Sequence, residues 1–161
     1  MKKNLFILLL PALVLCFQMG PAFPSDLDRG RIPDMEGWRT EREMFQELSA
    51  PSGSYGTWHQ KLFTDPSGRA VVVNLLCGEG PGELYVPPGP VSHDDRPIGL
   101  GATYETIEIE GLRGVLEYYP YAGYALAISL PDSSTLCLES KALSKEILSG
   151  FARSLVRRLF S

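Results

Sequence analysis

The chain has 161 residues, of which 44% are apolar, and a formal charge of −4 at pH 7. A chain of this length suits one domain that buries one hydrophobic core. The net negative charge disfavours nucleic acid and anionic membrane surfaces as partners, because both are bound through clustered positive charge.

The N-terminus has the pattern of a secretory signal peptide. Lys2 and Lys3 precede an apolar run over residues 5–17, and small residues stand near Ala22. The run is shorter than the roughly 20 apolar residues that a membrane-spanning helix needs. We therefore expect cleavage of residues 1–22, export to the periplasm or cell envelope, and no stable membrane span afterwards. Cleavage leaves 13 of the 15 basic residues against 19 acidic ones, a charge of −6.

Cys16 offers a second interpretation of the same segment, in which it becomes the lipidated first residue of a lipoprotein. Lipoprotein signals usually carry a small residue directly before this cysteine, whereas Leu15 is large. The sequence therefore favours cleavage over lipidation.

The first part of the expected mature chain has little periodicity. Residues 23–36 are polar and interrupted by proline and glycine, which predicts a flexible lead-in before a single domain over 37–161. The sequence Thr-Glu-Arg-Glu at 40–43 matches a capping box and favours a short helix over residues 40–48. A strand over the same residues is the alternative.

Alternating apolar residues and turn signals predict a series of antiparallel strands. A tight turn at 65–68 joins two of them as a hairpin. The expected strands cover residues 57–64, 69–77, 103–110, 113–119, 124–130 and 135–139. Residues 78–101 are rich in proline and glycine and predict a long loop.

The C-terminus carries the strongest helix signal of the chain. Ser144 is a candidate N-cap, and a stripe of apolar residues with helical spacing follows it to Leu159. Acidic Glu146 at the start and basic Arg157 near the end suit the helix dipole. The predicted fold is therefore α+β, an antiparallel sheet of about five to seven strands with the C-terminal helix packed on one face.

The last third of the chain resembles the ending of several exported bacterial α+β domains. The resemblance rests on Gly-Tyr-Ala-Leu-Ala-Ile at 123–128, Leu-Cys-Leu-Glu-Ser at 136–140, and the helix that follows with Ser-Leu at 154–155. The families concerned are PsbP/Mog1-like proteins and the uncharacterised domains found in anti-sigma-factor tails. The resemblance implies an antiparallel sheet with a helix on it and a non-enzymatic role in the envelope, and it supplies no ligand residue.

One polar cluster in the long loop is a candidate metal site. His93, Asp94 and Asp95 combine an imidazole with two carboxylates, and these ligands suit Zn²⁺ or Mn²⁺. A small metal-dependent enzyme or metal binder is the corresponding function. The alternative is a solvated loop in which Asp95 pairs with Arg96.

The two cysteines beyond the signal segment, Cys77 and Cys137, are candidates for a disulfide in an oxidising compartment. A bridge needs both side chains on the same side of adjacent strands. Alternation places Cys77 on the face of Leu75 and Cys137 on the face of Glu139, so free thiols are the alternative. A Cys–His nucleophile can be composed from the two cysteines and the two histidines, but no catalytic spacing supports it, and an enzyme is the less favoured class.

Tyrosines are the leading candidates for a binding surface. They are Tyr85 in the long loop and Tyr118, Tyr119, Tyr121 and Tyr124 around one turn. Gathered at one edge, they would form an aromatic platform for an envelope protein partner, without a cofactor. Packing of tyrosines across strands is the alternative. A small-ligand carrier, with its ligand held between helix and sheet, is a further possibility.

Overall fold

The computed structural model describes residues 31–79, 84–96 and 99–161. The predicted signal peptide and Cys16 lie outside the described residues. In chain order the elements are β1 (Arg39–Ala50), β2 (Gly53–Thr64), β3 (Ala70–Cys77), β4 (Ser92–Asp94), β5 (Thr103–Ile109), β6 (Leu112–Tyr119), β7 (Gly123–Ser129), β8 (Thr135–Ser140) and α1 (Lys145–Leu159).

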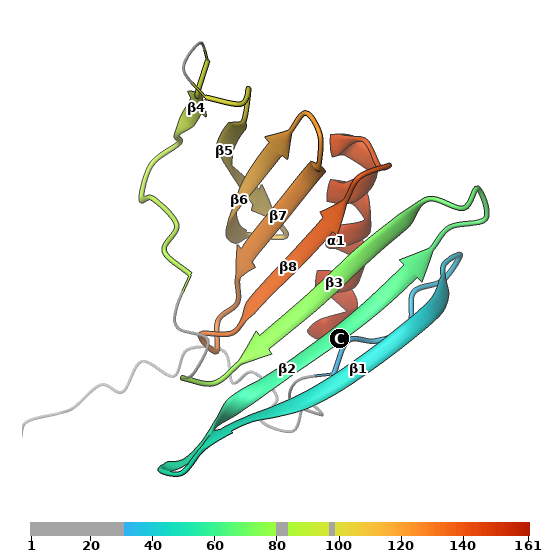
Figure 1. Ribbon diagram of the computed structural model, residues 1–161, viewed down its shortest axis with the longest axis vertical. Helices are drawn as coiled ribbons and strands as arrows, with labels where there is room; N and C mark the ends of the chain where they lie inside the picture. The colour runs from blue at the N-terminus through green and yellow to red at the C-terminus, as the bar shows by residue number, and fades with distance from the viewer. Residues whose placement is uncertain (1–30, 80–83, 97–98) are drawn as a thin grey trace, which may run out of the picture.

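All eight strands of the described chain belong to one antiparallel sheet in the order β1-β2-β3-β8-β7-β6-β5-β4. Two meanders, β1–β3 and β4–β8, meet where β3 pairs with β8 and Val73 stands opposite Leu138. The helix α1 crosses behind the sheet in Figure 1. The predicted antiparallel sheet with a helix on one face is confirmed, and the sheet has more strands than the five to seven expected.

The first additional strand is β1, and the short helix predicted over residues 40–48 is wrong. β1 pairs with β2 from Arg39 opposite Thr64 to Ala50 opposite Gly53, through eleven residue pairs. A capping box contributes only about 1 kcal/mol, so the long ladder of backbone hydrogen bonds outweighs it. The other addition is the short β4, which forms inside the predicted loop and pairs with β5.

Glycine permits the close approach of β2 and β3 at one end of their ladder. Gly56 has a φ of +138°, and a Cβ atom at this position would lie 1.9 Å from the carbonyl oxygen of Cys77. Any other residue would separate the two strands here, because the obstacle is rigid backbone.

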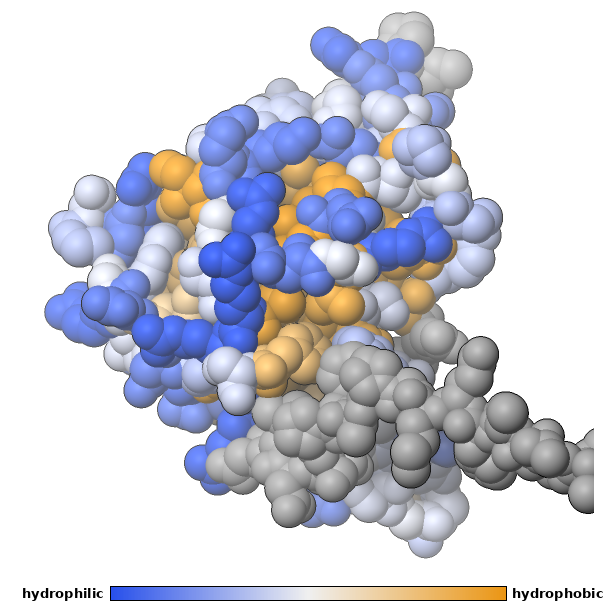
Figure 2. Space-filling model, turned by 180° about the vertical axis from the view of Figure 1, so that it is seen from behind, coloured by the Kyte–Doolittle hydropathy of each residue, from blue (hydrophilic) through white to orange (hydrophobic). Residues whose placement is uncertain are grey.

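The core lies between α1 and one face of the sheet, which we call the covered face. Its largest fully buried side chains include Phe63, Leu126, Leu136, Leu138, Leu148 and Leu155. The predicted N-cap is confirmed, since the hydroxyl of Ser144 accepts from the Ile147 N–H. Seen from the α1 side, polar side chains surround the apolar surface that stays visible (Figure 2).

Residues 31–36, which we call the N-terminal strap, also cover this face. Ile32 and Met35 are only 2% and 5% exposed and belong to the core. Just after the strap, the ring of Trp38 packs edge-on against Phe151 with centroids 4.7 Å apart. The described part of the expected flexible lead-in is therefore packed, and the core begins before Gly37.

Candidate functional site

The other face of the sheet has no helix over it, and we call it the open face. Strand register places Val115 opposite Ala127, and Ala127 opposite Cys137. The next residues in this row, Asn74 and Gln60, are polar. Along this row the side chains are therefore apolar over β6–β8 and polar over β3 and β2.

On the open face, side-chain hydrogen bonds to Asn74 join β2 and β3. Asn74 Oδ1 accepts from Trp58 Nε1 at 3.0 Å and from Gln60 Nε2 at 2.8 Å. Both donors lie on β2 and the acceptor lies on β3. These bonds link the side chains of the two strands.

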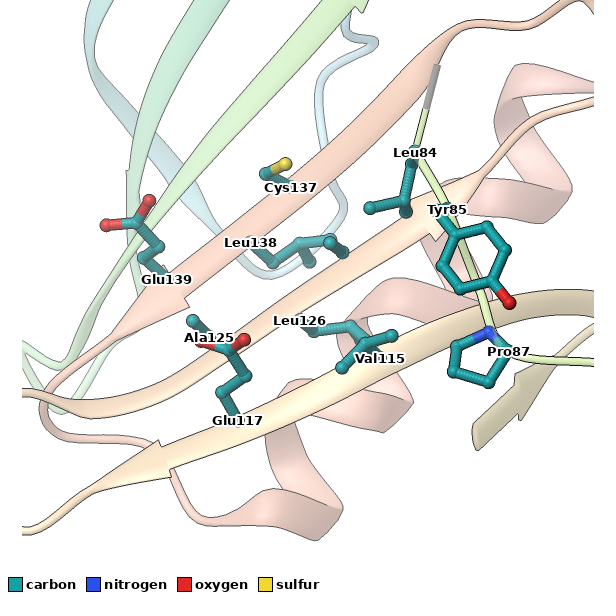
Figure 3. A pocket seen from close by; sticks show the side chains of 11 residues that line it. Leu84, Tyr85, Pro87, Val115, Glu117, Ala125, Leu126, Cys137, Leu138 and Glu139 are labelled. Atoms are coloured by element: carbon teal, nitrogen blue, oxygen red, sulfur yellow. The ribbon is translucent and has the colours of Figure 1, made fainter. Parts of the chain in front are cut away.

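The open face contains a cavity of about 400 Å³ between β6–β8 and the segment that follows β3. Leu84, Tyr85 and Pro87 form its wall, and the central residues of β6, β7 and β8 form its floor (Figure 3). The small side chains of Ala125 and Ala127 provide the space for the cavity, because neighbouring strands carry larger side chains at the paired positions. A concave apolar site of this size can enclose a small ligand or a long side chain.

Two carboxylates mark one end of the cavity. Glu117 on β6 and Glu139 on β8 stand on either side of Ala125 on β7. In Figure 3 they lie at the end away from Leu84 and Tyr85. Neither glutamate has an ion-pair partner within the part of the chain that the structure describes. The cavity thus has an apolar end and an acidic end.

The charge of Glu117 acts on a neighbouring phenol. Tyr119 follows two residues later on the same side of β6. The pKa of its hydroxyl is raised, chiefly by the negative charge of Glu117. Both residues face the side of the sheet that holds the cavity. A negative potential therefore extends along this end of the open face.

Cys137 contributes its thiol to the cavity floor. Burial, with a smaller contribution from the charge of Glu139, raises the pKa of Cys137 to about 11. The thiolate is the nucleophilic form of cysteine, so this side chain is a weak nucleophile near neutral pH. It serves the cavity as a small apolar group.

The two cysteines are free thiols. Cys77 packs against the core on the covered face, and Cys137 lines the cavity on the open face. The pairing considered from the sequence is therefore not made in this structure, because the two side chains leave their strands in opposite directions.

The three candidate metal ligands, on β4 and directly after it, each contact a different residue. The ring of His93 stacks on Tyr104, with centroids 5.2 Å apart. Asp94 accepts from Arg96 Nε at 2.9 Å, and this side-chain bond is the main reason that the pKa of Asp94 falls to about 2. Asp95 Oδ2 accepts from the Leu100 N–H at 3.0 Å. Arg96 thus pairs with Asp94, where the sequence suggested Asp95.

No group of three or more His, Cys, Asp or Glu residues that could hold a metal occurs among the described residues. The three side chains of the predicted site are adjacent in the sequence, and successive residues of a strand point to opposite faces. The structure therefore does not bring His93, Asp94 and Asp95 together as one set of ligands.

The five candidate tyrosines do not share one surface either. Tyr118 and Tyr124 pack together on the covered face, with ring centroids 4.7 Å apart. Tyr119 lies on the open face, and Tyr121 is 82% exposed in the turn before β7. Tyr85 is 77% exposed and stands at the cavity wall. Of the five, Tyr85 alone lines the cavity.

Sequence reasoning did not single out Glu117, Glu139 or the alanines of β7 as parts of a site. The two glutamates and the alanines lie on three different strands, and only the register of β6, β7 and β8 brings them together. The available signal was the run of small residues at alternate positions of β7, which predicts space above the sheet.

Together these features define a class: a small α+β domain with one covered sheet face and one open face that carries an apolar, acid-ended cavity. No family model matches the chain, and neither curated proteins nor solved structures give a match. The described residues include no helix with the length and apolar character needed to cross a membrane.

Proposed function

We propose that the chain is an exported binding domain of the cell envelope that recognises a protein partner at its open face. In this proposal the cavity receives a lysine or arginine side chain of the partner. The observation that carries the proposal is the pair of carboxylates, Glu117 and Glu139, at one end of an otherwise apolar cavity. Lysine and arginine combine an apolar stem with a charged head and therefore match both ends.

The order of the two ends supports this choice of side chain. Val115 and Ala127 on the floor can contact the methylene groups of the stem. The charged head would then lie between Glu117 and Glu139, which have no cation of their own among the described residues. Charge-assisted hydrogen bonds to carboxylates are stronger than neutral ones.

The outer wall supports a protein rather than an isolated small molecule as the partner. Tyr85 is 77% exposed beside the cavity, and tyrosine is enriched at protein interfaces because it offers a large apolar surface with a polar tip. A partner chain that places its cation in the cavity would also contact this ring. The polar side chains of Gln60 and Asn74 would form part of the rim.

The test uses a set of fluorescent peptides that differ only at a central residue, which is lysine, arginine, glutamine or glutamate between constant aliphatic neighbours. Binding is measured by fluorescence anisotropy. We expect the lysine and arginine peptides to bind at least about tenfold more tightly than the glutamine peptide, the size of one charged hydrogen bond. The glutamate peptide should bind weakest, because it would meet like charges.

Two pairs of variants locate the binding. The double variant Glu117→Gln, Glu139→Gln should remove the preference for lysine. The double variant Glu47→Gln, Glu79→Gln makes the same charge change at exposed positions elsewhere and should keep this preference. Ala127→Phe should fill the cavity and abolish binding, with Ala50→Phe at the exposed β1–β2 turn as its control. Equal binding of the lysine and glutamine peptides, or an unchanged preference in the first double variant, would contradict the proposal. If butylammonium alone competes as well as the peptides, the site belongs to a small-ligand carrier.

A further inference from the structure

A histidine on the covered face accepts one hydrogen bond from the backbone of the N-terminal strap. His59 on β2 is fully buried, and its Nδ1 atom accepts from the Ile32 N–H at 2.7 Å. On the other side of the ring, Nε2 lies 2.8 Å from Glu43 Oε1 on β1. The imidazole thus links the strap to the two outermost strands at this edge of the sheet.

These two contacts fix the protonation state of the ring. An N–H group can only donate, so Nδ1 carries no proton, and the proton of a neutral imidazole is then on Nε2. A carboxylate can only accept, and Glu43 accordingly accepts a hydrogen bond from the Nε2–H group. The imidazolium form has N–H groups on both nitrogens and therefore cannot accept from Ile32.

The charged groups near His59 come from β1, β2, the N-terminal strap and α1. Glu43 from β1 also lies 3.6 Å from Lys61 Nζ on β2, and Lys61 binds Asp34 Oδ1 of the strap at 2.9 Å. This bond is the main reason that the pKa of Asp34 lies below its usual value. From α1, Arg158 donates to the Asp34 carbonyl oxygen at 2.9 Å and lies 3.6 Å from Glu36.

An aromatic contact completes these surroundings. The ring of Phe45 from β1 meets His59 edge-on with centroids 5.8 Å apart, and the Arg31 guanidinium lies 5.9 Å from the centroid of Phe45. The nearest carboxylate of the cluster, Glu43, can pair with an imidazolium through the same Nε2 proton. The Ile32 N–H at Nδ1 is therefore the one contact that protonation must break.

We propose that the N-terminal strap is a pH-sensitive latch, closed by neutral His59 and released when His59 takes up a proton at Nδ1. Release carries Ile32 and Met35 out of the core and uncovers apolar surface on the covered face next to α1. Imidazole is the side chain that changes charge in mildly acidic solution, and in this proposal the strap opens while the sheet stays folded. The latch is independent of the open-face cavity, which lies on the other side of the sheet.

The test is amide hydrogen exchange of the full chain, followed from about pH 7.5 down to about pH 5, the range in which imidazole titrates, with rates corrected for the intrinsic effect of pH. Protection of the Ile32 amide and its strap neighbours should fall at least about tenfold, which reports a local opening. Amides of β3 and α1 should keep their protection. Retained protection of Ile32 in acid would overturn the latch.

Two histidine variants separate the latch from acid effects on the carboxylates. In His59→Asn the side-chain carbonyl oxygen can accept from Ile32 as Nδ1 does, and it does not titrate, so strap protection should become independent of pH. His93→Asn alters the other histidine and should leave the response as in the wild type. An acid response that persists in His59→Asn would assign the opening to Asp34 or Glu43 and sink the proposal.

A spectroscopic measurement on the wild type keeps the latch testable if His59→Asn fails to fold. Nitrogen NMR of the imidazole distinguishes a ring protonated only at Nε2 from one protonated at both nitrogens. We expect the Nε2 form of His59 near neutral pH, and its conversion should follow the same pH curve as the loss of Ile32 protection. Two separate curves would contradict the latch.

Discussion

The two faces of the sheet differ although the same strands build both. On β8, Leu136 and Leu138 are fully buried under α1, whereas Cys137 and Glu139 between and after them are partly exposed on the open face. On β2, buried Phe63 and His59 alternate with half-buried Leu62 and Gln60. The comparison teaches that one face supplies the stability of this fold while the other leaves side chains and a cavity accessible.

The difference arises from the connections rather than from the strands. The chain leaves β8 through Ser140 and turns back as α1 over the covered face, and the N-terminal strap fills the remainder of that face. On the open face, the segment around Leu84 to Pro87 covers part of the sheet and leaves the cavity beneath it (Figure 3).

The largest expected effect comes from truncation on the covered face. Phe151 on α1 contacts both Trp38 and Phe63, so Phe151→Ala should lower the free energy of unfolding by about 3–5 kcal/mol. Leu76 is half-buried on the open face, and Leu76→Ala should cost only about 1 kcal/mol. Urea denaturation measures both values, and equal losses would contradict the assignment of stability to one face.

An intermediate effect is expected where the sheet passes into the helix. The hydroxyl of Ser140 donates to the Ala70 carbonyl at 2.6 Å and accepts from the N–H groups of Ala142 and Leu143. Ser140→Ala leaves these backbone groups, of which that of Leu143 is buried, without their partner and should cost about 1–3 kcal/mol. Ser154→Ala on the exposed side of α1 is the matched control and should change stability by less than about 0.5 kcal/mol. A similar change in both variants would show that this junction is not what orients α1.

The effect on stability that is smallest near neutral pH is the titration of Cys137, which is also a sharp probe of the open face. Because its pKa is raised to about 11, its thiolate should be about 100-fold scarcer at mildly alkaline pH than that of an ordinary thiol. In a variant with Cys16→Ser and Cys77→Ser, alkylation should be correspondingly slow and should accelerate up to about pH 11. A raised pKa favours the neutral form in the folded state, so stability should fall as the pH rises from the ordinary thiol value of 9.0 towards 11. Alkylation at the rate of an ordinary thiol would contradict the buried position of Cys137 in the cavity floor.

The parts of the fold that sequence reasoning found are those with strong local signals. The helix after Ser144 has a cap, a periodic apolar stripe and favourable end charges, and the hairpin of β2 and β3 has a turn sequence between two alternating segments. β1 was missed because its local pattern suggested a helix, and β4 was missed because it has only three residues in a loop rich in proline and glycine.

The candidate site divides in the same way. Tyr85 was found from its residue type and its place in the long loop, and it lines the cavity. The alternation of β7 indicated that small residues share one face, but Glu117 and Glu139 became neighbours of that face only through strand register. The expected grouping of tyrosines was not made because alternation sends Tyr118 and Tyr119 to opposite faces of β6.

By itself, the sequence determined six of the strands, the start of the terminal helix and the apolar stripe by which this helix packs, because these properties depend on the period of apolar residues and on local caps and turns. The tertiary structure alone decided that β3 pairs with β8, that the strap donates a hydrogen bond to His59, and that two glutamates from separate strands lie at one end of the same cavity. Such contacts join residues far apart in the chain, and their geometry depends on register and packing rather than on any local pattern.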